Sequence, residues 1–273
     1  MSIILGIDVG GSTTKIVCLQ GKECIGMLQV KASDQVTSMY GAIGNLLTRL
    51  KIPLTDVSDI YLTGVGATFI NNDIFGITTH KISEFSAIGH GAVYQTKLKE
   101  ALVVSMGTGT AFVKVSADTV SHIGGSGVGG GTVIGLASQM LGKSDIDAIL
   151  ALAEIGTAEL VDLTVGDIIC NANDIKTLPA DLTASNFGKM KSTASDSDVA
   201  FGIINLVFET IGMLSIFALK NESIKDVVLT GTLATFPQAK PIFSRFKSIT
   251  DLNFIIPDNA GFVTALGAVV LGI

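Results

Sequence analysis

Two short polar turns carry the residues whose types and spacing could do phosphate chemistry. The first turn follows an apolar run that ends near Asp8, and a second apolar run comes after it. It consists of Gly10, Gly11, Ser12, Thr13, Thr14 and Lys15. Glycines let backbone N–H groups close on an anion, while hydroxyls and a lysine add donors and positive charge. Carboxylate oxygens are ligands that Mg²⁺ prefers, so Asp8 is a candidate to hold this ion beside a nucleotide. An ordinary hairpin is the alternative.

The second turn repeats the first about a hundred residues later. Aligning Asp8 with Ser105 matches Gly10 to Gly107 and Thr13 to Thr110, with apolar runs on both sides of each turn. The second turn itself consists of Gly107, Thr108 and Gly109. Two such hairpins in one chain predict two related domains. Because the charged stretch 97–100 separates the hairpins, we expect domains at residues 1–99 and 100–273.

Strands and helices are expected to alternate around these turns. Besides the hairpins, strands are predicted over 23–30, 59–63, 79–82, 119–123, 226–230 and 253–256. Helices are predicted over 35–50, 85–94, 132–140, 199–220 and 260–271, with helical spacing continuing through the 140s and 150s, another helix opening near residue 68 and one after Pro237. Residues 165–170 and 181–190 form a less regular insert that the pattern leaves unassigned. The alternation predicts an α/β fold.

The helix over 199–219 raises the question of a membrane, because the chain is 48% hydrophobic with a mean hydropathy of +0.57. Asn205, Glu209 and Gly212 share one narrow face of this helix at i, i+4 and i+7. A carboxylate in the middle of a membrane-spanning helix costs about 2.5 to 3.5 kcal/mol. The segment is therefore predicted to be a buried core helix or a subunit interface, with a membrane span as the alternative.

The net charge, the amino terminus and the cysteines argue against several classes of protein. The net charge is -6 and no basic run occurs, so no nucleic-acid partner is expected. The amino terminus lacks the features of a signal peptide, and we expect a cytoplasmic protein without a membrane segment. Cys18, Cys24 and Cys170 do not cluster, so neither a disulfide framework nor a zinc site is predicted.

Three further features are candidates for a site. Glu84 is expected where a strand meets a helix, either as a general base for a hydroxyl nucleophile or as a residue favoured by the helix dipole. Exposed N–H groups of residues 129–132, at the start of a helix, would attract an anion. The pattern Gly-x-Gly-x-x-Gly over 125–130 is interpreted as incidental, because it follows the third strand of its domain. A relaxed Walker A match over 137–144 is interpreted as a helix that ends at Gly142.

Several of these motifs resemble known ones. Residues 8–15, 105–110 and 229–232 are similar to the two phosphate motifs and the adenosine motif of the actin and hexokinase superfamily of phosphotransferases. Within that superfamily, residues 83–85, 122–132, 181–188 and 259–268 closely resemble type II pantothenate kinase. The last three segments read His-Ile-Gly-Gly-Ser-Gly-Val-Gly-Gly-Gly-Thr, Asp-Leu-Thr-Ala-Ser-Asn-Phe-Gly and Asn-Ala-Gly-Phe-Val-Thr-Ala-Leu-Gly-Ala.

The resemblance implies two ribonuclease-H-like domains with mixed sheets flanked by helices, and ATP in the cleft between them. It implies Mg²⁺-dependent transfer of the γ-phosphoryl group to pantothenate, the first step of coenzyme A biosynthesis. Glu84 would be the catalytic base and Asp8 would orient Mg²⁺ or its water. The nucleotide would contact both turns together with Gly130, Gly131, Thr132, Val133, Ile134 and Thr232. The substrate would contact Ser105, His122 and Thr183. A homodimer, with dimerisation helices in the second domain, and feedback by coenzyme A or its thioesters are also implied.

One residue departs from the family pattern, and rival functions remain open. The family commonly has arginine where this chain has His122, and imidazole cannot reproduce the bidentate contact of a guanidinium with a carboxylate. The rivals are a kinase for another hydroxyl substrate such as a sugar, an ATPase that drives a reductase through an iron–sulfur cluster, and a nucleotide-binding module without turnover. Paired cysteines near a dimer axis would be needed for the second rival.

Overall fold

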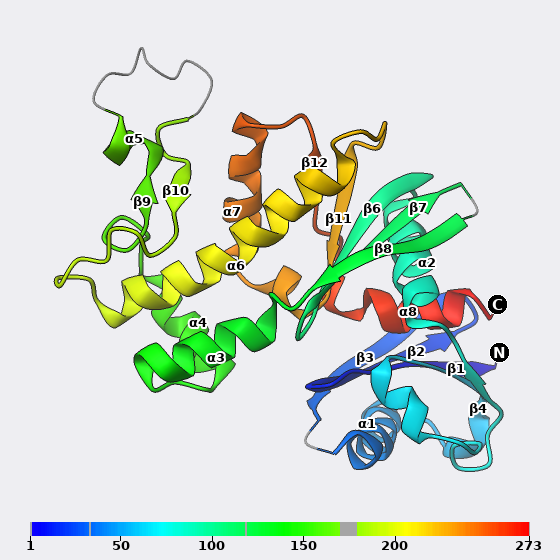
Figure 1. Cartoon of the computed structure of the whole chain (residues 1–273). Coiled ribbons are helices and arrows are strands. Elements are labelled where there is room, and N and C mark those ends of the chain that lie inside the picture. Colours follow the sequence, from blue (N-terminus) through cyan, green and yellow to red (C-terminus); the bar gives the residue numbers. More distant parts are fainter. Residues whose placement is uncertain (1, 33, 118, 170–178, 273) are drawn as a thin grey trace.

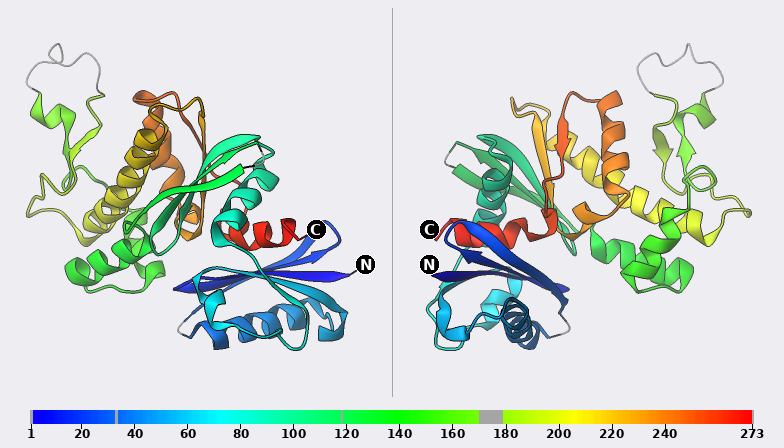
Figure 2. Two further views of the ribbon diagram at one scale, coloured as in Figure 1. Left: turned by 45° about the vertical axis from the view of Figure 1, so that its right-hand side comes forward. Right: turned by 180° about the vertical axis from the view of Figure 1, so that it is seen from behind.

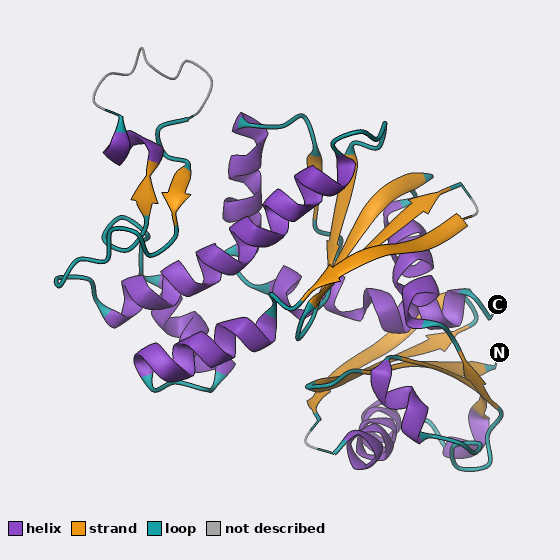
Figure 3. Ribbon diagram, viewed as in Figure 1, coloured by secondary structure: helices purple, strands orange, loops and turns teal. Residues whose placement is uncertain are grey.

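Two five-stranded mixed sheets form the framework of the protein, and two helices lie between them (Figure 1, Figure 3). The structure, a computed structural model, describes residues 2–32, 34–117, 119–169 and 179–272. The first sheet has the order β3-β2-β1-β4-β5 and the second the order β12-β11-β6-β7-β8. In each sheet the three hairpin strands are antiparallel and the two others are parallel to the first strand of the hairpin. The predicted α/β fold of two related sheet domains is confirmed.

The strand bounds agree with the predicted ranges to within a few residues. The first sheet consists of β1 (Ile3–Val9), β2 (Thr13–Gln20), β3 (Glu23–Lys31), β4 (Val57–Thr63) and β5 (Thr79–Lys81). The second consists of β6 (Glu100–Met106), β7 (Thr110–Ser116), β8 (Thr119–Ser126), β11 (Asp226–Thr230) and β12 (Asn253–Ile255).

The helix that ends each half of the chain packs against the sheet of the other half. Helix α2 (Glu84–Thr96) places Ile88 and Ala92 in the core of the second sheet, and α8 (Val263–Val270) places Ala265 in the core of the first. Both helices lie between the two sheets (Figure 2). They approach each other closely because Gly267 has no side chain. A Cβ at this position would clash with the carbonyl oxygen of Ala87. The small residues of the last helix therefore permit this packing, as predicted.

The other helices cover the outer faces. Helix α1 (Gln35–Leu50) covers the first sheet, with Asp34 accepting a hydrogen bond from the Thr37 N–H at its start. The second domain carries α3 (Gly130–Leu141), α4 (Ile146–Glu154), α6 (Asp196–Leu219) and α7 (Ala239–Arg245). A small hairpin of β9 (Leu163–Thr164) and β10 (Thr183–Ser185), with the single turn α5 (Val165–Ile168), stands at the far end of α6 (Figure 1). The predicted end of α3 at Gly142 is confirmed by its left-handed φ of 64°.

Helix α6 is the one helix among the described residues that is long and apolar enough to cross a membrane, and 61% of its apolar window is buried. The face of this helix that carries Asn205, Glu209 and Gly212 is hydrogen-bonded and packed within the protein. Asn205 donates to Asp162, Glu209 accepts from Thr183, and a Cβ at Gly212 would clash with Phe246. The prediction of a buried core helix is confirmed.

One sequence prediction is revised, and the positions of two cysteines are now defined. Residues Val65–Phe69 form a short 3₁₀ helix rather than an α-helix, and the backbone at Gly66 packs directly on Val9. Cys18 packs under α1 while Cys24 lies on the α8 side of the sheet, so these two thiols face opposite sides. Cys170 lies outside the described residues.

Candidate phosphoryl-transfer site

The first hairpin places a carboxylate opposite an ammonium group. Asp8 in β1 and Lys15 in β2 are direct partners in the antiparallel register, and the Gly10 N–H closes the turn on the Thr13 carbonyl oxygen at 3.0 Å. Lys15 is only 6% exposed. Antiparallel partners point to the same face of a sheet, so both charged side chains lie on one side of the hairpin.

The second hairpin has a similar turn, but it has no charged side chains at the positions equivalent to Asp8 and Lys15. Its turn is closed by the Gly107 N–H, which donates to the Gly109 carbonyl oxygen at 2.8 Å. Met106 pairs with Thr110, whereas Val9 pairs with Thr14 in the first hairpin. The second turn is therefore one residue shorter. Thr110 corresponds to Thr14, which corrects the predicted match with Thr13.

The start of α3 packs on the second hairpin through backbone hydrogen bonds. The N–H groups of Gly130 and Gly131 donate to the carbonyl oxygens of Gly107 and Thr108 at 2.8 and 2.9 Å. The Gly129 N–H donates to the Thr132 hydroxyl, and the N–H groups of Thr132 and Val133 donate to the Gly129 carbonyl oxygen. These N–H groups are not free to bind an anion, which corrects the expectation from the sequence. The glycines serve close packing, because a Cβ at Gly129 would lie 2.6 Å from the Thr108 carbonyl oxygen.

The two turns meet across the molecule. The hydroxyls of Ser12 and Thr108 are hydrogen-bonded at 2.9 Å, although 96 positions separate them in the sequence. Both side chains are exposed. A group bound between the hairpins would therefore contact hydroxyls from both halves of the chain.

Glu84 lies close to the first hairpin, as the first residue of α2. Burial raises the pKa of its carboxyl group above the ordinary value, and the negative charge of Asp8 raises it further. Burial also raises the pKa of Asp8, with the Lys15 ammonium acting in the opposite direction. The pKa of Lys15 is lowered by burial and raised by Asp8. Two mutually repelling carboxylates with raised pKa values form a site that a cation would stabilise.

The described residues contain no group of three or more His, Cys, Asp or Glu side chains that could hold a metal ion. A Mg²⁺ ion at Asp8 would therefore take its other ligands from a nucleotide and from water, as this ion commonly does. Three buried hydroxyls near the strand ends, those of Thr14, Thr63 and Thr230, also have no hydrogen-bond partner within the described part of the chain. Buried polar groups rarely stay unpaired, so these hydroxyls fit a site that is completed by ligand or water.

Thr232 belongs to a seven-residue turn that occurs twice, a repeat that the sequence reasoning missed. Residues 63–69 read Thr-Gly-Val-Gly-Ala-Thr-Phe and residues 230–236 read Thr-Gly-Thr-Leu-Ala-Thr-Phe. Gly64 and Gly231 have φ values of 89° and 88°, and each opens a short 3₁₀ helix. Thr68 and Thr235 each donate to the carbonyl oxygen three residues earlier, at 2.8 and 2.7 Å. A search for internal repeats would have detected this signal.

A cavity of about 690 Å³ adjoins the second copy of this turn. Its walls come from the turn itself, from α7 and from the segment between β12 and α8, and they include Thr235, Phe236, Lys240, Asp258 and Asn259. Aromatic and polar side chains around a space of this size suit a base and a ribose. The turn that carries Thr232 thus borders this cavity through Ala234, Thr235 and Phe236.

Four further predicted residues lie on the second sheet and on α3. Ser105 is a half-buried residue of β6, while His122 is an exposed residue of β8. The His122 ring stacks on Phe85 with centroids 3.9 Å apart, so it lies beside the start of α2 and near Glu84. Val133 is buried in the core of the second domain and Ile134 is half-buried on α3.

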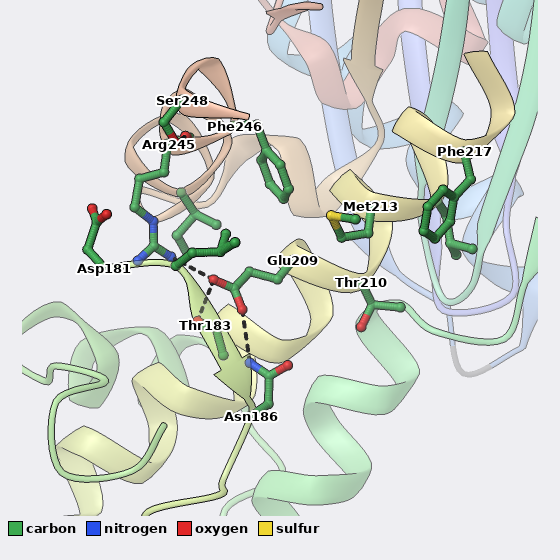
Figure 4. A pocket seen from close by; sticks show the side chains of 13 residues that line it. Asp181, Thr183, Asn186, Glu209, Thr210, Met213, Phe217, Arg245, Phe246 and Ser248 are labelled. Atoms are coloured by element: carbon green, nitrogen blue, oxygen red, sulfur yellow. Dashed lines mark hydrogen bonds and ion pairs between the residues drawn. The ribbon is translucent and has the colours of Figure 1, made fainter. Parts of the chain in front are cut away.

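Thr183 lies elsewhere, on β10 at the opposite end of the second domain (Figure 1), in the pocket shown in Figure 4. Its hydroxyl donates to Glu209 at 2.8 Å, and Asn186 and Arg245 also bind Glu209. These side chains line a cavity of about 420 Å³ whose other walls are mostly apolar, with Asp181, Thr210 and Ser248 as further polar residues. The structure therefore does not bring Thr183 together with the hairpins and Glu84 of the same chain.

The fold and the paired hairpins define a member of the actin and hexokinase-like class of ATPase folds. Among solved structures, the activator of the 2-hydroxyisocaproyl-CoA dehydratase from Clostridium difficile with bound ADPNP has a TM-score of 0.72 at 16% identity, over 98% of this chain and 93% of its own. The Fumble family model matches residues 46–270, and the chain belongs to this family.

Curated relatives carry the name that the sequence motifs suggested. A type II pantothenate kinase of Bacillus anthracis is 29% identical over 98% of this chain and 97% of its own length. A type II pantothenate kinase of Bacillus cereus (strain G9842) is 27% identical over 98% of both chains. The resemblance predicted from the motifs is confirmed.

Proposed function

We propose that this protein transfers the γ-phosphoryl group of ATP to the primary hydroxyl of pantothenate. The product would be 4′-phosphopantothenate, and the reaction would be the first step of coenzyme A biosynthesis. The names of the relatives support the substrate. The observation that carries the chemistry is the position of Glu84, where burial and then the nearby Asp8 raise its pKa, beside two hairpins that meet through Ser12 and Thr108.

Glu84 acts as the general base in this proposal. Its carboxylate accepts the proton of the primary hydroxyl as the hydroxyl oxygen bonds to the γ-phosphorus and the bond from phosphorus to the ADP oxygen breaks. A raised pKa makes the carboxylate a stronger base near neutral pH. Mg²⁺, held by Asp8 directly or through water, would neutralise charge on the phosphate oxygens.

The two halves of the chain divide the binding of ATP. Residues 10–15 and 107–109 border the phosphates, with Lys15 supplying positive charge from the first hairpin. The segment 130–134 offers a glycine surface beside the second hairpin, and Thr232 borders the ribose or base. Ser105 and His122 contact pantothenate from the second sheet.

We infer that the protein works as a homodimer in the cytoplasm. Phe217 of α6 is 62% exposed and lines the cavity that also holds Thr183. An exposed apolar wall of this kind favours a partner surface. A second copy docked on this face would allow Thr183 to approach a substrate of the other chain, and coenzyme A or its thioesters would act as feedback ligands.

The test is ADP release by the purified protein with ATP and Mg²⁺, with and without pantothenate and with a panel of sugars. We expect pantothenate to stimulate release and Glu84→Gln to lower kcat about 10²- to 10⁴-fold. The matched control is Glu154→Gln, because Glu154 is an exposed residue at the end of α4. Turnover with a sugar and none with pantothenate would refute the substrate, and full activity of Glu84→Gln would refute the base.

A further inference from the structure

The first copy of the repeated turn lies beside both carboxylates of the candidate site. The Ile82 N–H donates to the Leu62 carbonyl oxygen at 2.8 Å, so the segments leading to Glu84 and to Gly64 run side by side. A Cβ at Gly64 would lie 2.6 Å from Asp8 Oδ1. The residue that follows this glycine, Val65, is therefore one position along the chain from backbone that packs against Asp8.

Val65 is an unusual residue for such a place. Its side chain is 60% exposed, while the neighbouring apolar residues Val9 and Leu62 are fully buried. The equivalent residue in the second copy of the turn is Thr232, which carries a hydroxyl. The two copies thus present different chemistry in the same backbone shape, since one offers a hydroxyl and the other an exposed branched hydrocarbon.

This difference matches the two molecules that the reaction joins. The second copy adjoins the cavity suited to a polar ribose and a base. The first copy adjoins the acceptor, and in pantothenate the carbon beside the reacting CH₂OH group carries two methyl groups. A sugar has hydroxyl-bearing carbons at the corresponding place. An apolar side chain there favours an acceptor with hydrocarbon next to its primary alcohol.

We propose that Val65 is a specificity-determining residue that packs against the two methyl groups of the acceptor. The inference rests on the proposed function and deepens it, because it assigns the first copy of the turn to the acceptor. Thr is the closest test replacement, since Val65→Thr keeps the branched shape and exchanges one methyl group for a hydroxyl. The exposure of Val65 means that the fold does not depend on this methyl group.

The experiment compares pantothenate with the analogue in which both methyl groups are replaced by hydrogen. We expect Val65→Thr to lower kcat/KM for pantothenate about fourfold, and to change kcat/KM for the analogue less than twofold. The KM for ATP should stay unchanged. Ile155→Thr is the matched control, because Ile155 is a 79% exposed branched residue in the second domain. Its kinetics should equal those of the unaltered protein.

The outcomes separate this inference from the function on which it rests. If the unaltered protein phosphorylates pantothenate and Val65→Thr leaves kcat/KM unchanged, or lowers it equally for both acceptors, the role of Val65 is refuted while the function stands. If the unaltered protein does not phosphorylate pantothenate, the proposed function is refuted and the role of Val65 falls with it. Thermal unfolding of both variants checks that each remains folded.

Discussion

The two halves of this protein share a fold and differ in charge. Each half has a hairpin, two parallel strands, a repeated turn and a closing helix. In the first half Asp8 faces Lys15 across the hairpin, whereas in the second half Ser105 faces Ala111. The first hairpin therefore places a carboxyl group opposite an amino group, whereas the equivalent positions of the second hairpin carry a hydroxyl and a methyl group.

The largest loss of activity should come from removing the carboxylate of Asp8, which distinguishes the first hairpin from the second. Asp8→Asn removes the carboxylate proposed for Mg²⁺, and we expect kcat to fall about 10²-fold or more. Ser105→Ala, at the equivalent position, should lower kcat/KM for pantothenate by at most about tenfold, since one hydrogen bond is lost. Steady-state kinetics of both variants measure the contrast. Equal losses would contradict the division of roles.

The shared backbone can be tested at the two turn glycines. Gly64→Ala and Gly231→Ala each place a Cβ at positive φ and within 2.6 Å of other atoms. Each should lower the free energy of unfolding by about 1 to 3 kcal/mol. Gly41→Ala is the control, because Gly41 lies in α1 with nothing within 4 Å and should stabilise the protein by about 0.5 to 1 kcal/mol. Urea unfolding measures all three, and a neutral Gly64→Ala would contradict the equivalence.

A substitution at His122 tests what happens when the second half gains a positive charge beside the candidate site. His122→Arg should lower the KM for pantothenate about tenfold, because a guanidinium forms charge-assisted hydrogen bonds with a carboxylate. The flat guanidinium can keep the stacking on Phe85. The KM for ATP is the internal control. An unchanged or raised KM for pantothenate would place the substrate carboxylate elsewhere.

The smallest expected effect is a shift to higher pH of the acidic side of the pH profile of kcat/KM. The pKa of Glu84 is raised above its ordinary 4.5, so its basic form is lost while pH is still above that value. We expect kcat/KM for pantothenate to fall as pH decreases, with a midpoint above 4.5. Circular dichroism at each pH checks that the protein stays folded. A midpoint at or below 4.5 would mean that Glu84 is not the titrating base.

Local patterns in the sequence were sufficient for most elements and for the phosphate hairpins. The ranges of α1 and β3, the end of α3 at Gly142 and the polar stripe of α6 follow from periodicity, glycine and spacing within one element. The family resemblance was also readable from short motifs and is confirmed by the relatives. These features depend on residues that are neighbours along the chain.

Features that join distant segments were decided only by the tertiary structure. The hydrogen bond between Ser12 and Thr108 and the raised pKa of Glu84 arise from groups far apart in sequence. The insert that carries Thr183 could not be assigned, because its two- and three-residue strands are held by side chains of α6 rather than by their own periodicity. The glycine segment before α3 was predicted to bind an anion, yet its N–H groups bind the second hairpin. A sequence displays which groups are present, and only folding determines which groups are already paired with each other.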